Sequence, residues 1–335
     1  MAPSPRPCPP PPASPTGRPA GPGRPRRDAP VAVLGECVAD AFTTPAGPGA
    51  LDLHVLPGGG PANTAAALAR LGTPTRFLGR LSDDVFGRLF RSRLTAAGVD
   101  LGAVVEAAEP STLAVADVDA GGGAAYSFHA TGTADWQWTD AELERAARAP
   151  AACLHTGSLA LVRDPGGPAV ERLLAAVRPR ATVSLDPNVR PLLVDPARYR
   201  ARLARWCAAA DVLRCSEEDL DHLLPDAGPE RAADTWHTSG VRLVVVTLGA
   251  RGVFASLDGH RLHVPTPPVA VVDTVGAGDA FTAGLLHGLH RAGELGGRLD
   301  GLGPDVLHDA LTTGVRLSAA VCAVRGADPP RETPR

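Results

Sequence analysis

Lysine is absent from this chain of 335 residues, so its 33 basic residues are all arginine. A chain without lysine cannot form a Schiff base with a carbonyl substrate, and it has no lysine for a Walker-type phosphate loop. Any site that clamps phosphate must therefore be built from arginine, backbone amides or a metal ion.

Strong positive charge and long hydrophobic runs are also missing. The formal net charge is −3, which offers no basic stripe for a phosphate backbone, so we expect no nucleic-acid partner. No apolar run approaches the roughly 18 residues of a membrane-spanning helix, so we expect no membrane partner.

Cysteine is sparse and irregularly spaced. There is no CxxC pair and no metal-type spacing between cysteine and histidine. Reduced thiols in the cytoplasm are the simplest explanation for the six residues, Cys8, Cys37, Cys153, Cys207, Cys215 and Cys322.

The composition indicates a globular enzyme with two tails. With 44% apolar residues, the chain can bury the core of one large α/β domain or two modest ones. Residues 1–30 are rich in proline and arginine and lack the apolar segment of a signal peptide, so we expect a disordered tail there. We place the folded domain at 31–328 and a flexible tail at 329–335.

Apolar runs and alternating runs predict the strands. Val31 to Gly35 is a short apolar run, typical of a strand buried on both faces of a parallel sheet. From residue 139 onward strand and helix alternate, which predicts a doubly wound, mostly parallel sheet flanked by helices. A smaller, half-exposed sheet is expected from the alternating segments 51–56, 111–119 and 124–129. We expect it to form a lid, drawn from about 36–57 and 104–132.

Helix-start signals and apolar periodicity predict the helices. We expect Trp136 and Trp138 to anchor the core or lid rather than to stack on a ligand. The expected helices are 61–71 after a Gly60 cap, 83–97 after Ser82 with Val85 on its buried side, one opened by a Thr139–Glu142 capping box, and one from Ala280.

The most informative run is Asp273-Thr274-Val275-Gly276-Ala277-Gly278-Asp279-Ala280-Phe281. A glycine turn that opens an apolar helix points bare N–H groups at one spot, where the helix dipole also favours an anion. Asp279 then lies within one turn of that anion, where it can accept a proton from an attacking hydroxyl. The run therefore predicts phosphoryl transfer to an alcohol.

A second glycine-rich loop precedes the first predicted helix. Pro61 at the start of that helix puts Asn63 in its first turn, facing the mouth of the loop. Asp40 follows the first strand, at the sheet edge where ligands collect. Asp40 and Asn63 together could bind sugar hydroxyls. A glycine turn with a solvated Asn63 and a surface Asp40 is the alternative.

These two loops resemble the paired signatures of the PfkB, or ribokinase-like, carbohydrate kinase family. GGGPANTAAALARLG at 58–72 is similar to the N-terminal signature, and DTVGAGDAFTAGLL at 273–286 is similar to the C-terminal one. The resemblance extends over about residues 31–328. It implies a ribokinase-like fold with a small β-sheet lid, and ATP and Mg²⁺ as cofactors.

The resemblance also implies roles for particular residues. Asp279 would be the general base and the amides of Gly276, Ala277 and Gly278 an anion hole. Asp186 to Arg190 resembles a stretch of the fructokinase branch, so Arg190 would approach the phosphate or the acceptor; a loop arginine paired with Asp195 is the alternative. The remaining matches are sugar-binding Asp40, Gly59 and Asn63, and nucleotide-binding Thr247, Gly249 and Gly252.

One family motif is altered here. The NxxE motif, which organises water around Mg²⁺, is replaced by Ser216-Glu217-Glu218-Asp219, so Asp219 would contact the metal through water. The same four residues also fit a helix capping box. Small residues from Ala319 to Cys322, before Gly326, lie where the family places adenine and a monovalent-cation loop, which leaves K⁺ open as a cofactor.

The leading hypothesis is a cytoplasmic ATP-dependent kinase of a primary hydroxyl on a small sugar, with fructose as the first candidate. 2-Keto-3-deoxygluconate, ribose and nucleosides are alternative acceptors. A catalytically silent sugar sensor or assembly protein is the alternative of another class. A nicotinamide dehydrogenase would need GxGxxG after the first strand, which Gly35-Glu36-Cys37 does not provide. The lid could also form a homodimer interface.

Overall fold

The computed structural model describes residues 29–118 and 124–328. The predicted tail at 1–30, except for its last two residues, the turn at 119–123 and the tail at 329–335 lie outside the described residues. Among the described helices, none has both the length and the apolar character needed to cross a bilayer.

An eight-stranded sheet forms the centre of the molecule, in the order β14-β13-β12-β11-β10-β9-β1-β4. The strands from β12 to β4 are parallel, and β13 and β14 add an antiparallel edge. Their bounds are β1 Val31–Leu34, β4 Thr75–Leu78, β9 Cys153–Gly157, β10 Thr182–Asp186, β11 Val212–Ser216, β12 Leu243–Thr247, β13 Val253–Leu257 and β14 His260–Val264.

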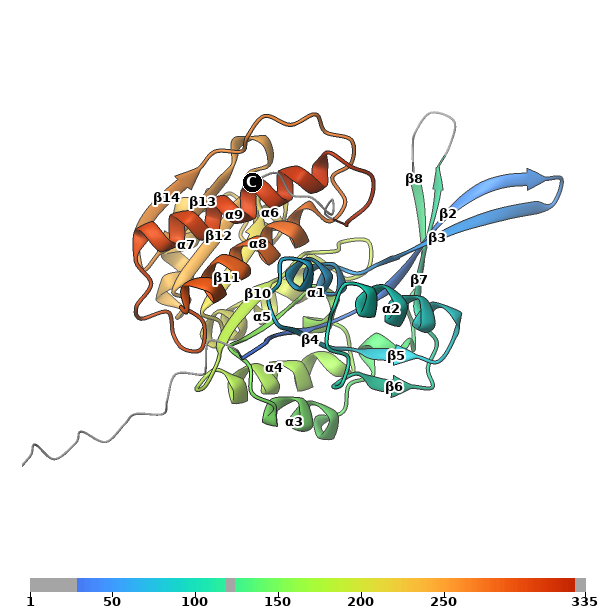
Figure 1. The fold of residues 1–335 in the computed structure, drawn as a ribbon, viewed down its shortest axis with the longest axis horizontal. Coiled ribbons are helices and arrows are strands. Elements are labelled where there is room, and N and C mark those ends of the chain that lie inside the picture. The colour runs from blue at the N-terminus through green and yellow to red at the C-terminus, as the bar shows by residue number, and fades with distance from the viewer. Residues whose placement is uncertain (1–28, 119–123, 329–335) are drawn as a thin grey trace, which may run out of the picture.

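Helices cover both faces of this sheet, as a doubly wound fold requires (Figure 1). One core contains residues of α1 Gly60–Arg70, α2 Val85–Ala96, α8 Ala277–Ala292 and α9 Pro304–Cys322. The other contains residues of α3 Asp140–Arg148, α4 Gly166–Val177, α5 Pro196–Ala209, α6 Glu217–Leu223 and α7 Pro229–Thr238. The predicted fold class is confirmed.

A second sheet of four strands, in the order β3-β2-β7-β8, forms the predicted lid. Figure 1 shows its β2–β3 hairpin (blue) projecting away from the body. The bounds are β2 Val38–Gly47, β3 Ala50–Gly58, β7 Thr112–Val118 and β8 Ala124–His129; a short parallel pair, β5 Arg80–Ser82 and β6 Val105–Ala107, lies apart.

Asp135 connects the lid to the body of the molecule through hydrogen bonds at the base of two lid strands. It lies in a short 3-10 turn, Ala134–Trp136, and its carboxylate accepts hydrogen bonds from the Cys37 amide at 3.0 Å and the Thr112 hydroxyl at 2.6 Å. Cys37 precedes β2 and Thr112 begins β7, so one buried carboxylate orders the base of both strands. Burial raises the pKa of Asp135 to about 6, and the hydrogen bond from Thr112 partly opposes this rise.

Several helix starts differ from the sequence predictions. Gly59, not Gly60, caps α1, because its φ of 100° turns the chain into the helix. Asp84, not Ser82, caps α2 by accepting a hydrogen bond from the Gly87 amide at 2.8 Å. The side chain of Val85 is 60% exposed rather than buried, because it occupies the first helical position beside this cap.

Other predictions hold. The Thr139–Glu142 capping box is present at α3, and Trp136 and Trp138 are buried in the core. Helix α8 begins at Ala277, three residues before the prediction, because Gly276 adopts the left-handed conformation and caps it.

Candidate active site

The carboxyl ends of the parallel strands meet at one edge of the central sheet. Glu36 follows β1, Asn188 follows β10, and Ser216 and Thr247 end β11 and β12. Helices α1 and α8 begin at the same edge. This is where ligands of open α/β sheets bind, so the predicted site residues converge where the fold favours a site.

Asn63 and Asp279 lie in direct contact. The side-chain amide of Asn63 donates to Oδ2 of Asp279 at 2.8 Å. The Thr64 hydroxyl donates to the Asp279 main-chain oxygen at 3.3 Å, so two residues of α1 hold the first turn of α8. Among the described residues, Asp279 forms no ion pair and Oδ1 receives no hydrogen bond, which leaves that oxygen available to a substrate hydroxyl.

The free oxygen lies beside the bare backbone of Gly60. A Cβ on Gly60 would lie 3.1 Å from Oδ1 of Asp279 and 3.0 Å from the Asn188 amide nitrogen. A side chain at Gly60 would therefore crowd the carboxylate. The glycine-rich loop before α1 keeps the approach to Asp279 open.

The protein environment makes Asp279 a better base. Burial raises the pKa of its carboxyl, while the Asn63 hydrogen bond and the positive charges of Arg190, Arg214 and Arg93 oppose the rise. A carboxylate with a raised pKa accepts a proton more readily, yet these partners favour its ionised form. Both effects suit a general base.

The amides at the start of α8 are only partly free. The Ala277 N–H donates to the Thr274 carbonyl at 3.2 Å and so closes the turn, which departs from its predicted place in an anion hole. Among the described residues, the N–H groups of Gly276 and Gly278 have no acceptor. Two of the three predicted amides are therefore available to an anion at the positive end of the helix dipole.

Asp40 belongs to the lid strand β2, and Arg190, in the loop after β10, is close enough to influence both Asp40 and Asp279. Burial raises the pKa of Asp40 to about 6, opposed by the charges of Arg93 and Arg190. Arg190 is exposed, and its guanidinium donates to the Val189 carbonyl at 3.1 Å. No Arg190–Asp195 ion pair forms among the described residues, because Asp195 caps α5 through the Ala197 amide. Arg190 is thus free to approach a ligand.

The lack of a side chain at Gly59 allows the loop before α1 to adopt its conformation. Its φ is 100°, and a Cβ there would lie 2.5 Å from the Glu36 carbonyl oxygen. Only glycine tolerates both constraints without strain. It lets the loop before α1 pack closely against the segment that follows β1.

A cavity of about 580 Å³ lies on the other side of α8's first turn. The predicted nucleotide residues Thr247, Gly249 and Gly252 line it, and so do Ala319 and Cys322 of α9. Ala277 and Gly278 form its inner end. The cavity thus runs from the predicted adenine region to the predicted anion hole.

Arg214 and Asp186 were missed as site residues by the sequence reading. Arg214 lines the same cavity and donates to Asp186 at 2.6 Å and to the Thr247 hydroxyl at 2.8 Å. The available signal was a charged residue at the centre of β11, a strand that is otherwise buried and apolar.

Asp219 forms the capping box that was the structural alternative. Its Oδ2 accepts from the Ser216 amide at 3.0 Å and from the Ser216 hydroxyl at 2.6 Å, and its Oδ1 accepts from the Val189 amide at 2.7 Å. A carboxylate accepts about four hydrogen bonds, so one position remains for a water molecule.

Residues 29–118 and 124–328 contain no group of three or more His, Cys, Asp or Glu side chains that could hold a metal ion. Mg²⁺ usually binds one or two carboxylates, waters and substrate phosphates rather than an all-protein cage, so Asp219 through water fits this ion. At the predicted monovalent-cation loop, the Gly326 amide donates to Asp273 at 2.9 Å.

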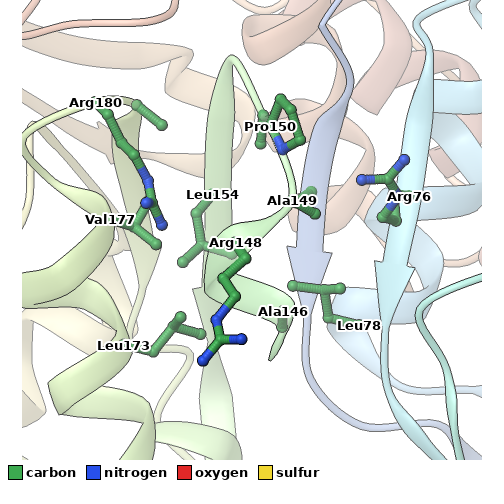
Figure 2. A pocket seen from close by; sticks show the side chains of 13 residues that line it. Arg76, Leu78, Ala146, Arg148, Ala149, Pro150, Leu154, Leu173, Val177 and Arg180 are labelled. Atoms are coloured by element: carbon green, nitrogen blue, oxygen red, sulfur yellow. The ribbon is translucent and has the colours of Figure 1, made fainter. Parts of the chain in front are cut away.

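A separate cavity of about 260 Å³ lies at the opposite ends of the strands (Figure 2). Ala32, Leu154 and Ala181 lie near the starts of β1, β9 and β10. Arginines at its rim, including Arg148 and Arg180, are its charged lining residues, and no carboxylate lines it. It lacks a general base and is distinct from the candidate active site.

The geometry defines a class of chemistry. A carboxylate with a free oxygen lies in the first turn of α8, beside unused amides and next to residues that line a cavity. Such an arrangement suits transfer of a phosphoryl group from a donor in the cavity to a hydroxyl under the lid.

Comparisons with known proteins agree with this class. A family model described as pfkB family carbohydrate kinase matches residues 29–334. A fructokinase of Klebsiella pneumoniae is 38% identical over 281 residues, which cover 82% of this chain and 88% of that protein. The chain therefore belongs to the pfkB family of carbohydrate kinases, and it is a sugar kinase.

Two solved structures share the fold. The fructokinase from Vibrio cholerae O395 with fructose, ADP and calcium ion bound has a TM-score of 0.75 and 29% identity, and the match covers 90% of this chain and 95% of that one. The fructokinase from Xylella fastidiosa with bound ATP has a TM-score of 0.81 and 26% identity, and the match covers 90% and 94%.

Proposed function

We propose that this protein transfers the γ-phosphoryl group of ATP to a primary hydroxyl of fructose. The observation that carries the proposal is Asp279: among the described residues its Oδ1 receives no hydrogen bond, and the preceding residue, Gly278, lines the cavity. The curated relative from Klebsiella is a fructokinase, and the Vibrio structure holds fructose and ADP. Both support this choice of acceptor and donor.

In the proposed mechanism, sugar binds between the lid and the loop before α1. Asp40 and Asn63 bind its hydroxyls, and Gly59 allows the close approach of the loop. Asp279 accepts the proton of the primary hydroxyl as that oxygen attacks the γ-phosphorus. The proton ends on Oδ1 of Asp279, and a new bond forms between the sugar oxygen and the γ-phosphorus. The bond between the γ-phosphorus and the oxygen that bridges it to the β-phosphate breaks, and ADP leaves with that electron pair.

The transferring group needs electrostatic stabilisation. We assign this role to the free amides of Gly276 and Gly278 and to Arg190, with Ala277 shaping the turn. These groups are fixed before substrate arrives, so little reorganisation is required during the reaction. Thr247, Gly249 and Gly252 bind the nucleotide along the cavity that they line.

We propose Mg²⁺ as the metal, held by the nucleotide phosphates and, through water, by Asp219. When bound, it neutralises charge on the phosphate oxygens. The Asp273–Gly326 contact supports testing a monovalent cation such as K⁺, by comparing rates in potassium and tetramethylammonium salts.

An ADP-release assay with a panel of sugars tests the function. The account predicts the highest kcat/KM for fructose, with ribose, 2-keto-3-deoxygluconate and a nucleoside lower. A different preferred sugar would retain the kinase but replace the acceptor. Sugar binding without any ADP would overturn the kinase and favour the silent sensor.

We also propose that the lid forms a homodimer interface. Its apolar side chains include Phe42, Leu51, Leu53 and Tyr126, all more than a third exposed. Leu51 and Leu53 lie on the sheet face opposite Asp40, so a second copy could cover them without blocking the site. Sedimentation should report a dimer that Leu53→Glu dissociates, while Leu192→Glu, an exposed site outside the lid, should not.

A further inference from the structure

Arg214 is a buried cation that the proposed mechanism has not used. It is the third residue of β11, and it is 5% exposed. Its neighbours Leu213 and Cys215 are fully buried, so the strand places one permanent charge within the protein interior. A buried charge is costly unless its hydrogen-bonding groups are satisfied.

The described partners satisfy only part of the guanidinium. One terminal nitrogen donates to Oδ2 of Asp186 at 2.6 Å, and the other donates to the Thr247 hydroxyl at 2.8 Å. An arginine has five N–H donors, so three are not used by any residue of 29–118 or 124–328. One of these is Nε, which is fully buried and has no acceptor.

The guanidinium borders the nucleotide cavity, and its two terminal nitrogens each carry one unused N–H group, whereas Nε is buried. Arg214 lines this cavity together with Thr247, Gly278 and Phe281. A Cβ on Gly278 would lie 2.9 Å from each terminal nitrogen of Arg214. The guanidinium therefore packs closely against the first turn of α8, and the absence of a side chain at position 278 permits this contact.

The surroundings fix the position of the cation. Asp186 and Thr247 hold it from the adjacent strands β10 and β12, and the ring of Phe281 lies 5.8 Å from its central carbon. A guanidinium held on three sides has lost its side-chain freedom during folding. It can therefore bind an anion at a small entropic cost.

We propose that Arg214 binds the phosphate chain of the nucleotide through the unused N–H groups of its two terminal nitrogens. The ligand chemistry is that of a nucleoside di- or triphosphate, because planar N–H donors pair well with phosphate oxygens. Arg214 lies in the cavity rather than under the lid, so it contacts the part of the nucleotide that remains after transfer. It stabilises bound ADP as well as ATP.

This inference rests on the proposed function. It gives two arginines separate roles: Arg190 stabilises the transferring phosphoryl group, and Arg214 binds the phosphates of the nucleotide. Arg190 is exposed and is not among the residues that line the nucleotide cavity, whereas Arg214 is buried and lines it. Loss of Arg190 should therefore reduce turnover more than ADP affinity. Loss of Arg214 should reduce ADP affinity directly.

The test compares ADP and adenosine binding to the full chain by titration calorimetry. Arg214→Met alone would leave Asp186 as an unpaired buried carboxylate, so the variant is Arg214→Met with Asp186→Asn. Asp186→Asn alone is the matched control, since it retains the guanidinium. Adenosine has no phosphate and reports on the base and ribose regions of the cavity.

The double variant should lose about tenfold to about a hundredfold in ADP affinity, the size of a charge-assisted hydrogen bond or two. Its adenosine affinity should stay within about twofold of the control. An equal loss for both ligands, or unchanged ADP affinity, overturns the proposal. If the double variant does not fold, Arg214→Lys must show the same selective loss of ADP affinity.

Failure of this inference can be told apart from failure of the proposed function. If the wild-type protein releases ADP with fructose but the Arg214 variants bind ADP as tightly as the control does, only the inference fails. If no sugar supports ADP release, the kinase proposal fails, whatever the calorimetry of ADP and adenosine shows.

Discussion

The side-chain amide of Asn63 donates a hydrogen bond to Oδ2 of Asp279 at 2.8 Å, across 216 residues of sequence. This contact joins the first turns of α1 and α8. It also favours the ionised carboxylate, because an N–H donor interacts more strongly with a charged oxygen than with a neutral one.

Asn63→Leu should shift the acid limb of the pH profile of kcat/KM to higher pH by about one unit, since a hydrogen bond to a charged group contributes about 1.5–3 kcal/mol. Loss of the bond raises the pKa of Asp279, so activity at neutral pH falls and recovers partly at higher pH. Thr64→Val is the control, because Thr64 contacts the main chain of Asp279 and not its carboxylate. An unmoved acid limb with a higher KM for sugar would mean that Asn63 only binds sugar.

Glu36 should make the protein less stable as pH rises. It is 3% exposed, and burial raises its pKa to about 7, with a hydrogen bond from Ser158 opposing the rise. The ordinary value is 4.5, so between these two values the folded state holds one more proton than the unfolded state. The free energy of unfolding therefore falls with pH in this window, by at most about 3 kcal/mol.

Glu36→Gln removes this ionisation and should flatten part of the decline in melting temperature between about pH 5 and pH 8. The decline should not vanish, because burial also raises the pKa values of Asp40, Asp135 and Asp186 to about 6. Asp309→Asn changes an exposed carboxylate and should leave the slope as it is. Parallel slopes for Glu36→Gln and wild type would contradict the account.

Gly276→Ala should impair both stability and turnover. Gly276 has a φ of 76°, and a Cβ there would lie 2.5 Å from the Cβ of Ala327. The left-handed conformation costs an alanine about 1–2 kcal/mol, and the contact with Ala327 adds to this cost. Gly293→Ala is the matched control, because Gly293 has the same φ at the far end of α8. In denaturant titrations both variants should lose stability, but only Gly276→Ala should lose most of its kcat.

Asp219→Asn should raise the Mg²⁺ concentration for half-maximal rate by about tenfold, as expected when an outer-shell carboxylate is lost. Ser216→Ala is the control, because it weakens the capping box but keeps the carboxylate. It should cost about 1 kcal/mol of stability without changing the Mg²⁺ requirement. An unchanged Mg²⁺ requirement in Asp219→Asn would reduce Asp219 to a capping residue.

Local sequence patterns predicted the features that depend on local physics. The apolar run of β1 and the glycine loops before α1 and α8 follow from burial and backbone geometry. The Asp279 motif likewise lies within one turn. Each of these patterns lies within about ten consecutive residues, so the sequence alone was enough to predict the structure there.

The features that escaped prediction depend on distant partners. Arg214 is held by Asp186 and Thr247, which lie 28 and 33 residues away and become neighbours only when β10, β11 and β12 pair. The buried Asp135 acquires its role from Cys37 and Thr112 in the same way. No local pattern reports such contacts.

The most direct test of the central claim is turnover of Asp279→Asn with ATP and fructose. Asparagine keeps the size of the side chain but cannot accept the hydroxyl proton. The account predicts a fall in kcat of about a hundredfold to about ten-thousandfold, with ADP and fructose affinities within a few fold of wild type. A variant that keeps most of its kcat would contradict the assignment of Asp279 as the general base.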